Sequence, residues 1–271
     1  MGRKGSASVT GTTKQARGNT GAEKKTREKK PKMSPQEIEE KYGIRNKTLN
    51  YKIKFTAKNE KQQALFDIIG DKEISLVKGS AGVGKSWVVF SKALQLLKES
   101  SAYDKIIVLI PTMPAEEIGF LPGTLEDKIF SATLADRSTI IKVLNQSGNN
   151  GEEVLESLIT SGQIVFDCIS YWRGRSIDRA IVCVSESSNL TPNNIKTAIT
   201  RIENSVYVFS GDPEQSDLPL SRNGKTQPDG LTVAFEKLKD IEEIGKIIFT
   251  EEDEIVRNPI IRKILNAWKK E

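Results

Sequence analysis

A glycine-rich segment, GSAGVGKS, constrains this chain more than any other feature because it lies between an apolar run and a helical pattern. Its glycines let successive backbone N–H groups turn inward around an anion, and the helix that follows directs the positive end of its dipole at the same point. The spacing G-x-x-x-x-G-K-[ST] is that of a phosphate-binding P-loop. We therefore expect Lys85 to reach the β- and γ-phosphates of a nucleotide and the Ser86 hydroxyl to ligate Mg²⁺. The residues expected to hold the nucleotide in this segment are Gly79, Ser80, Ala81, Gly82, Val83, Gly84, Lys85, Ser86 and Trp87.

Apolar runs dense in Ile and Val alternate with helical patterns along most of the chain. The runs cover residues 74–78, 106–110, 164–169, 180–184, 206–209 and 246–249. Because each run is continuously apolar, it predicts a strand that is covered on both faces. Helical patterns cover residues 86–99, 192–202, 232–238 and 259–270, with a longer mixed region over 125–161. The sequence thus predicts an α/β fold of the P-loop NTPase type: a mostly parallel sheet with helices on both faces and ligands at the carboxyl ends of its strands.

The charge of the chain is divided unevenly. Residues 1–32 carry 10 Lys or Arg and 2 Glu, whereas the remainder carries 31 basic and 34 acidic side chains. Residues 1–33 have almost nothing apolar to bury, so we expect a disordered basic tail. Such a tail either binds a polyanion such as RNA or DNA, with an affinity that falls steeply with salt, or acts only as a solubilising terminus.

Residues 34–54 are expected to form a short helical linker ahead of a domain that covers residues 55–271. A Ser-Pro-x-Glu pattern at Ser34 supplies a cap, a first-turn proline and a capping-box glutamate. The linker resembles half of a helix-turn-helix with a second helix over 45–53, but residues 51–55 also alternate as a strand does.

The composition excludes several kinds of chemistry. Histidine is absent, which removes the commonest general base, the commonest metal ligand and the Ser-His and Cys-His nucleophiles. Cys168 and Cys183 lie in predicted buried strands, so we expect reduced thiols that pack as small hydrophobic side chains. No segment reaches the roughly 18 apolar residues of a membrane span, and the tail lacks the apolar core of a signal peptide. We therefore expect a cytoplasmic protein with no membrane partner.

Polar residues follow three of the predicted strands. Ser185 and Glu186 occupy the place of a Walker B segment, and Glu186 is the candidate for orienting the attacking water. Gln215, with Asp212 beside it, is a candidate sensor of the γ-phosphate or of that water.

Arginines follow the strand predicted over 164–169. Arg173 and Arg175 flank a glycine, and arginine is the side chain best suited to clamping phosphate. Tyr171 and Trp172 either stack on a base or pack beneath a loop.

These segments occur in a combination that resembles the PhoH family of P-loop ATPases. They are GSAGVGKS, PTMPAEEIGFLPGTLEDKI, SYWRGRSIDRAIVCVSESSNLT, ITRIENSVYVFSGDPEQSDLP, DGL and EIVRNPI, and they extend over about residues 55–268. The resemblance implies a RecA-like core similar to the motor domain of superfamily-one helicases, ATP hydrolysis with Mg²⁺, and action on RNA. It also implies a homo-oligomer such as a hexameric ring, in which an arginine of one subunit reaches the nucleotide of its neighbour.

Three further residues match motifs of the family. Gln62 matches the glutamine upstream of the P-loop and is a candidate for reading adenine. Arg201 and Arg257 match family arginines and are candidate fingers or sensors of the nucleotide.

The chain departs from the family where the Walker B aspartate is expected. The family usually has Asp-Glu followed by Ala-Gln-Asn, and this chain has Ser185, Glu186, Ser187, Ser188 and Asn189. Ser185 can still bind Mg²⁺ through a water, beside Ser86 and Glu186, but it carries no charge. Weaker Mg²⁺ affinity and slower turnover are expected.

Three functions are consistent with these residues. The first is an Mg²⁺-dependent ATPase that binds or remodels RNA, in which Lys85, Glu186, Gln215 and Arg257 take part in catalysis. The second is a hydrolysis-impaired protein that binds nucleic acid under the control of a bound nucleotide. The third is an assembly factor in which the ring is structural. Single-stranded RNA is preferred over DNA on the family resemblance alone.

Overall fold

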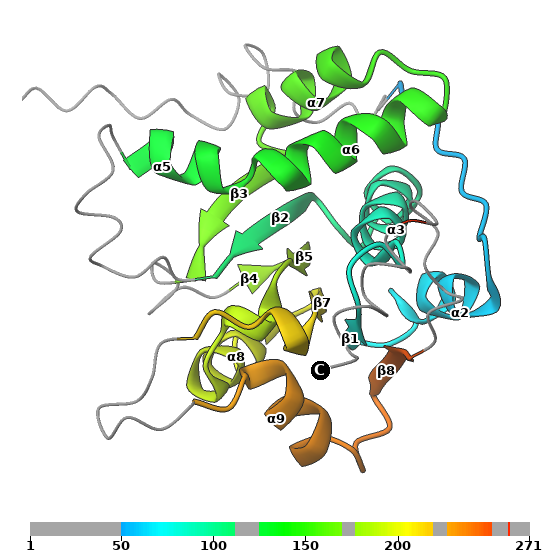
Figure 1. Ribbon diagram of the computed structural model, residues 1–271. Coiled ribbons are helices and arrows are strands. Elements are labelled where there is room, and N and C mark those ends of the chain that lie inside the picture. Colours follow the sequence, from blue (N-terminus) through cyan, green and yellow to red (C-terminus); the bar gives the residue numbers. More distant parts are fainter. Residues whose placement is uncertain (1–49, 112–124, 170–176, 219–226, 251–259, 261–271) are drawn as a thin grey trace, which may run out of the picture.

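One parallel sheet forms the centre of the protein. The computed structural model describes residues 50–111, 125–169, 177–218, 227–250 and 260. Six strands are arranged in the order β3-β2-β5-β7-β1-β8 (Figure 1). They are β1 (Ile74–Gly79), β2 (Lys105–Ile110), β3 (Ile164–Cys168), β5 (Ala180–Val184), β7 (Val206–Gly211) and β8 (Ile244–Phe249). Two short strands, β4 (Ile177–Asp178) and β6 (Ile202–Glu203), pair with each other in parallel.

Helices cover both faces of this sheet and create two hydrophobic cores. One face is packed by α2 (Glu60–Ile68), α3 (Lys85–Glu99), α6 (Leu134–Gln146) and α7 (Gly151–Thr160). The other face is packed by α8 (Pro192–Ile199) and α9 (Gly230–Lys237). Helix α5 (Leu125–Ala132) contacts the edge strand β3. The 3-10 turns η2 (Ser187–Asn189) and η3 (Pro213–Gln215) follow β5 and β7.

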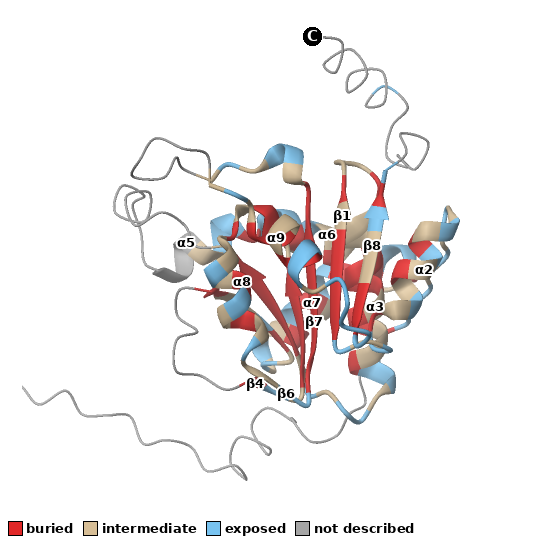
Figure 2. Ribbon diagram, turned by 90° about the horizontal axis from the view of Figure 1, so that it is seen from below, coloured by how far each residue is buried: buried red, intermediate tan, exposed pale blue. Residues whose placement is uncertain are grey.

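The central strands alternate their side chains between the two cores. On β2, Ile106 and Val108 belong to the core beneath α3, whereas Ile107 and Leu109 belong to the opposite core. Every residue of β5 and β7 is buried, so these two strands are the most continuously buried of the described strands (Figure 2). The expectation of strands covered on both faces is therefore confirmed for the central strands β1, β2, β5 and β7, whereas the edge strands β3 and β8 expose Val165 and Ile248.

The sequence predicted the fold class and the six strands of the main sheet correctly, and the structure corrects several details. The helix expected over 192–202 ends at Ile199, because Ile202 and Glu203 pair with β4. Helix α2 was not predicted from its apolar pattern, since only Gln62 and Leu65 within it are buried. The helix expected over 259–270 lies, except for Ile260, outside the described residues.

Residues 50–57 form an extended segment that is neither helix nor part of the sheet. Tyr51 is buried, and its hydroxyl donates to the Leu94 carbonyl of α3 at 2.8 Å. The Lys52 backbone exchanges hydrogen bonds of 2.8 Å with the Asn149 side chain. Because these contacts hold the backbone extended, residues 50–53 are not helical, although a helix was expected over 45–53. The rest of that helix lies outside the described residues.

Both cysteines are buried free thiols, as predicted. Burial in the apolar core raises the pKa of the Cys183 thiol, and the charge of Asp136 raises it further. In the described ranges, no helix has the length and apolar character needed to cross a bilayer.

We predict that Tyr51→Ala lowers the free energy of unfolding by about 3 kcal/mol, because it removes a buried ring and its hydrogen bond. Tyr51→Phe should cost only about 1 kcal/mol, the value of one hydrogen bond. Urea denaturation measures both. The exposed neighbour Lys52→Ala is the control, and equal costs for Tyr51→Ala and Lys52→Ala would show that the extended segment is not part of the fold.

Candidate nucleotide site

The topology places the P-loop at the point where the sheet diverges. From β1 the chain enters α3 on one face, whereas from the adjacent β7 it continues to α9 on the other face. In parallel α/β sheets, ligands bind in the crevice at such a point, outside the carboxyl ends of the strands. The loops that follow β1, β5 and β7 therefore surround a single location.

Glycines give the P-loop its shape. Gly82 and Gly84 have φ values of 90° and 88°, a left-handed conformation that favours glycine. Gly79 is required for a different reason, because a Cβ at this position would lie 2.6 Å from the Cβ of Phe249 on β8. The loop can therefore turn tightly at the start of α3 while β1 stays in close contact with its neighbour.

The Lys85 side chain bends back and contacts the P-loop that precedes it. Its ammonium donates to the carbonyls of Gly79 at 2.5 Å and Ser80 at 3.1 Å. Burial lowers the pKa of this ammonium, while the charges of Asp212 and Glu186 act in the opposite direction. Lys85, Asp212 and Glu186 thus lie close enough to interact, although they come from three different strand ends.

Gln62 connects α2 to the P-loop. Its side chain is buried, its Nε2 donates to the Val83 carbonyl at 2.8 Å, and its Oε1 accepts from the Lys58 N–H at 2.9 Å. One N–H of Nε2 and one lone pair of Oε1 are not used by these two bonds, so a contact with adenine could be made in addition to them. The adenine-reading role stays a prediction, and the observed contacts show a second role in holding the loop.

Glu186 has an unusual backbone conformation. It is exposed, with φ 51° and ψ 38°, in the left-handed region that non-glycine residues rarely adopt. Such conformations are often found at functional sites, where the surrounding structure maintains them. Here the following residue helps to hold the turn, since the Ser187 hydroxyl donates to the Val184 carbonyl at 2.8 Å.

Ser185 has a partner that the sequence analysis missed. Its hydroxyl donates to the Asp136 carboxylate at 2.8 Å. Asp136 lies in the first turn of α6 and is only 8% exposed. In the sequence it shares a helix face with Ile140 and Val143, so a charged residue in an apolar stripe was the signal that could have identified it.

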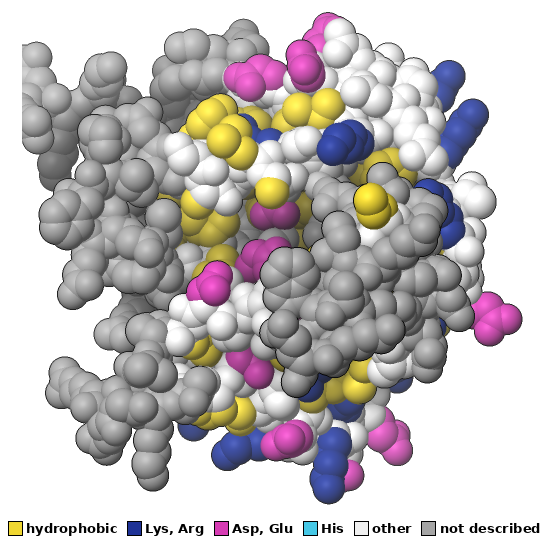
Figure 3. Space-filling model, viewed as in Figure 1, with side chains coloured by type: hydrophobic (Ala, Val, Ile, Leu, Met, Phe, Trp, Pro, Cys, Tyr) yellow, Lys and Arg dark blue, Asp and Glu magenta, His cyan; other side chains and the backbone are white. Residues whose placement is uncertain are grey.

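The surroundings of Asp136 disfavour the ionised form of its carboxyl group. Burial raises the pKa of its carboxyl from the ordinary 3.8 to about 6, the hydrogen bond from Ser185 lowers it, and the charge of Glu186 raises it further. Acidic side chains also gather near the middle of the face shown in Figure 3, between hydrophobic side chains, while many lysines and arginines lie at its periphery.

The loop after β7 carries the buried Asp212 and the exposed Gln215. Asp212 is buried and caps η3, where its carboxylate accepts from the Glu214 N–H at 3.1 Å. Gln215, at the end of η3, is exposed. This exposed position is compatible with the sensor role predicted for Gln215.

Hydrogen bonds join the loops that follow β5 and β7. The Ser216 hydroxyl donates to the Ser188 carbonyl at 2.9 Å, and the Asp217 N–H donates to the Asn189 side chain at 2.8 Å. The turns that carry Glu186 and Gln215 are thus fixed to each other.

The candidate arginines are not part of this described arrangement. Arg201 directly precedes β6. Burial raises the pKa of the Tyr207 hydroxyl, and the charge of Arg201 lowers it. Tyr207 pairs with Ile74 at the start of β1. Arg201 therefore lies at the amino edge of the sheet, away from the P-loop of its own chain. Arg173, Arg175 and Arg257 lie outside the described residues.

We predict that, in EDTA at pH 8, Asp136→Asn raises the free energy of unfolding by about 1–3 kcal/mol. The pKa of Asp136 is higher in the folded protein, so the native fold is favoured by the protonated carboxyl and loses that advantage as pH rises from about 4 to about 6. The gain from asparagine should shrink as the pH is lowered to 4. Thermal and urea unfolding at several pH values measure it, with the exposed Asp240→Asn as control. A loss of stability at pH 8 would show that the ionised carboxylate is well solvated or well paired.

Comparison with solved structures finds distant similarities. The large terminase of a thermophilic bacteriophage has 12% identity and a TM-score of 0.44, over 79% of this chain and 50% of its own. The Pif1 helicase of Candida albicans has 14% identity and a TM-score of 0.37, over 79% and 44%. Neither similarity is strong enough to bear on function.

Comparison with known sequences identifies the family. The PhoH-like protein of Bacillus subtilis (strain 168) is 35% identical over 195 residues, which cover 71% of this chain and 57% of that protein. Protein PhoH of Escherichia coli (strain K12) is 31% identical over 214 residues, 78% of this chain and 57% of that protein. The chain thus spans little more than half the length of these relatives. A family model described as PhoH-like protein matches residues 54–269, from the segment before α2 through the P-loop and the strand-end loops, so this chain belongs to the PhoH-like family and has a P-loop NTPase fold.

Proposed function

We propose that this protein is an Mg²⁺-dependent ATPase whose nucleotide state controls the binding or remodelling of RNA. The observation that carries the proposal is the meeting of Lys85, Glu186 and Asp212 at the carboxyl edge of the sheet, beside a glycine-rich loop that opens a helix. An anion cradle, a cation and a candidate water-orienting carboxylate are the parts that ATP hydrolysis requires.

Each residue has a defined role in this proposal. The loop N–H groups and Lys85 bind the phosphates, and Lys85 exchanges its carbonyl partners for phosphate oxygens. Glu186 orients the attacking water, and Gln215 reports whether a γ-phosphate is present. The bonds between the loops after β5 and β7 transmit that report from one loop to the other.

The donors present suit Mg²⁺. In the part of the chain that the structure describes, no three acidic or cysteine side chains gather as a preformed metal cage. Mg²⁺ typically keeps several waters and binds through one or two protein oxygens together with substrate phosphates. Ser86 would contact it directly, and Ser185 and Glu186 would contact it through water. When bound with the nucleotide, the ion neutralises charge on the phosphate oxygens.

Coupling to nucleic acid is supported by the division of charge. The basic residues of 1–32 and the slightly acidic remainder favour a tail that lies along a polyanion while the body binds nucleotide. Arg201, at the edge away from its own P-loop, would reach a nucleotide only in a neighbouring subunit, which is consistent with a ring-shaped homo-oligomer.

A second function is favoured by one residue. Ser185 replaces the charged Walker B aspartate of the family, and loss of that charge would weaken hydrolysis more than binding. The protein would then be a nucleotide-controlled binding or assembly factor.

We predict that purified protein hydrolyses ATP with Mg²⁺, and that Lys85→Ala and Glu186→Gln each lower kcat by about 100-fold or more. Lys85→Ala should also weaken nucleotide binding, whereas Glu186→Gln should leave it nearly unchanged, because a water-orienting residue does not hold the phosphates. Steady-state hydrolysis and fluorescent-nucleotide titration distinguish the two, with the exposed Lys196→Ala on α8 as control.

The same assay decides between the two functions. Turnover raised by single-stranded RNA, and reduced by high salt or by deletion of residues 1–33, supports a nucleic-acid-coupled ATPase. Tight nucleotide binding without turnover supports the nucleotide-controlled binding protein. Absence of both binding and turnover would refute both.

We predict that Gln62→Ala weakens ATP binding by about tenfold, because it removes a hydrogen bond that holds Val83 in the P-loop. Equilibrium titration with ATP and with GTP separates the two roles of this residue. Equal losses indicate that Gln62 only holds the loop, and a loss confined to ATP indicates that it reads adenine. The exposed neighbour Gln63→Ala is the matched control.

A further inference from the structure

We propose that Asp136 supplies, from helix α6, the negative charge that the family's aspartate would supply at position 185, and that it acts on a metal-bound water through the Ser185 hydroxyl. The inference rests on the proposed function, because it concerns the complex with Mg²⁺ and a nucleotide. In this arrangement Asp136 is a positioning residue, since it acts through Ser185.

The hydrogen bond fixes the direction of the Ser185 hydroxyl. A serine hydroxyl has one proton to donate and two lone pairs, whereas an ionised carboxylate only accepts. The proton of Ser185 therefore points to Asp136, at an Oγ–Oδ1 distance of 2.8 Å. Its lone pairs are left to accept from a water, and the carboxylate makes the hydroxyl oxygen a stronger acceptor.

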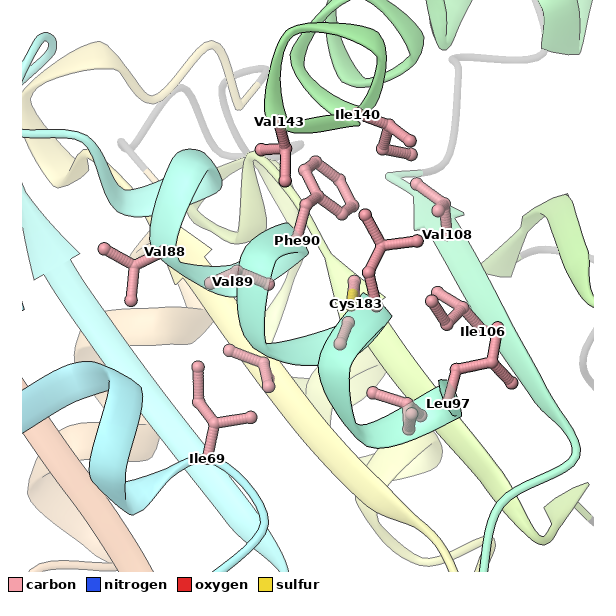
Figure 4. Close-up of a cluster of buried hydrophobic side chains, with 14 of the residues drawn as sticks. Ile69, Val88, Val89, Phe90, Leu97, Ile106, Val108, Ile140, Val143 and Cys183 are labelled. Atoms are coloured by element: carbon pink, nitrogen blue, oxygen red, sulfur yellow. The ribbon is translucent and has the colours of Figure 1, made fainter. Parts of the chain in front are cut away.

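The packing of α6 against α3 restricts the position of the Asp136 carboxylate. The buried face of α6 carries Ile140 and Val143, which lie against Phe90 of the P-loop helix α3 (Figure 4). Asp136 also lies close enough to Cys183 on β5 to raise the pKa of its thiol. One helix thus contacts the P-loop helix and places an acidic group at the end of the Walker B strand.

The protein itself provides little compensation for the negative charge of the Asp136 carboxylate. Among the described residues, its side chain has a single hydrogen-bond partner, Ser185, and the nearby charge that most affects it is the like charge of Glu186. A buried carboxylate in such surroundings is unfavourable unless a cation approaches. An Mg²⁺ ion at the phosphates, with Glu186 and Asp136 on the same side of it, would supply that cation.

If Asp136 supplies the negative charge, restoring the family's aspartate at position 185 should not by itself raise the affinity for the metal. Ser185→Asp in the native chain would place two carboxylates within hydrogen-bonding distance, and like charges so close favour protonation of one of them. Ser185→Asp combined with Asp136→Asn moves the single charge from α6 to the strand end. Only the combined variant reproduces the charge arrangement of the family.

The test is the Mg²⁺ dependence of ADP binding, measured by calorimetry, together with Mn²⁺ binding to the ADP complex measured by electron paramagnetic resonance. Asp136→Asn should weaken metal binding by about 10- to 100-fold, the usual effect of losing a residue that supports a metal site from behind. Ser185→Ala should cause a similar loss, and the Asp136→Asn/Ser185→Ala double variant little more, because the two residues act as one unit. Asp136→Asn/Ser185→Asp should recover most of the metal affinity, and Ser185→Asp alone should not.

Several outcomes separate this inference from the function on which it rests. Native metal affinity in both Asp136→Asn and the control Asp240→Asn would overturn the role of Asp136 while leaving the ATPase intact. Native metal affinity in Ser185→Ala would overturn it as well, and that variant keeps the proposal testable if Asp136→Asn fails to fold. A native protein that binds no nucleotide, with or without Mg²⁺, would instead refute the proposed function.

Discussion

Helices α3 and α9 leave the adjacent strands β1 and β7 toward opposite faces of the sheet, and the rest of the site depends on that divergence. In parallel α/β sheets, such a divergence creates the place at the carboxyl edge of the strands where ligands bind. The P-loop turns at this edge because Gly82 and Gly84 adopt a left-handed conformation. The helix dipole of α3 then acts at the same place as the ammonium of Lys85.

The charges of the described residues near the P-loop do not balance one another. Lys85 interacts with Asp212 and Glu186, and Asp136 interacts with Glu186. Among these four described residues, three carry a carboxylate and one carries an ammonium. A phosphate chain would add negative charge, so a divalent cation is the natural complement of both. This balance is the physical reason that a nucleotide and its metal would bind together.

Much of this arrangement could be predicted from the sequence. The P-loop spacing identified Lys85, and continuous apolar runs identified the strands that place Ser185, Glu186 and Asp212 at one edge. Other features could not be predicted, because their signals are not periodic. Helix α2 buries only two residues, and the short β4–β6 pairing depends on segments 25 residues apart in the sequence.

The sequence by itself determined the parallel α/β class, the spacing of the P-loop and the presence of serine at position 185, since each depends on residue types at short spacing. Only the tertiary structure decided which side chain lies beside Ser185. Asp136 is 49 positions from Ser185, and the two meet because α6 packs on α3 above the end of β5. Tertiary packing also placed Arg201 at the edge of the sheet away from the P-loop, because the helix α8 that precedes it runs back across the sheet before β7 begins. Local spacing specifies elements and loops, whereas contacts between distant segments are set by the way in which those elements pack.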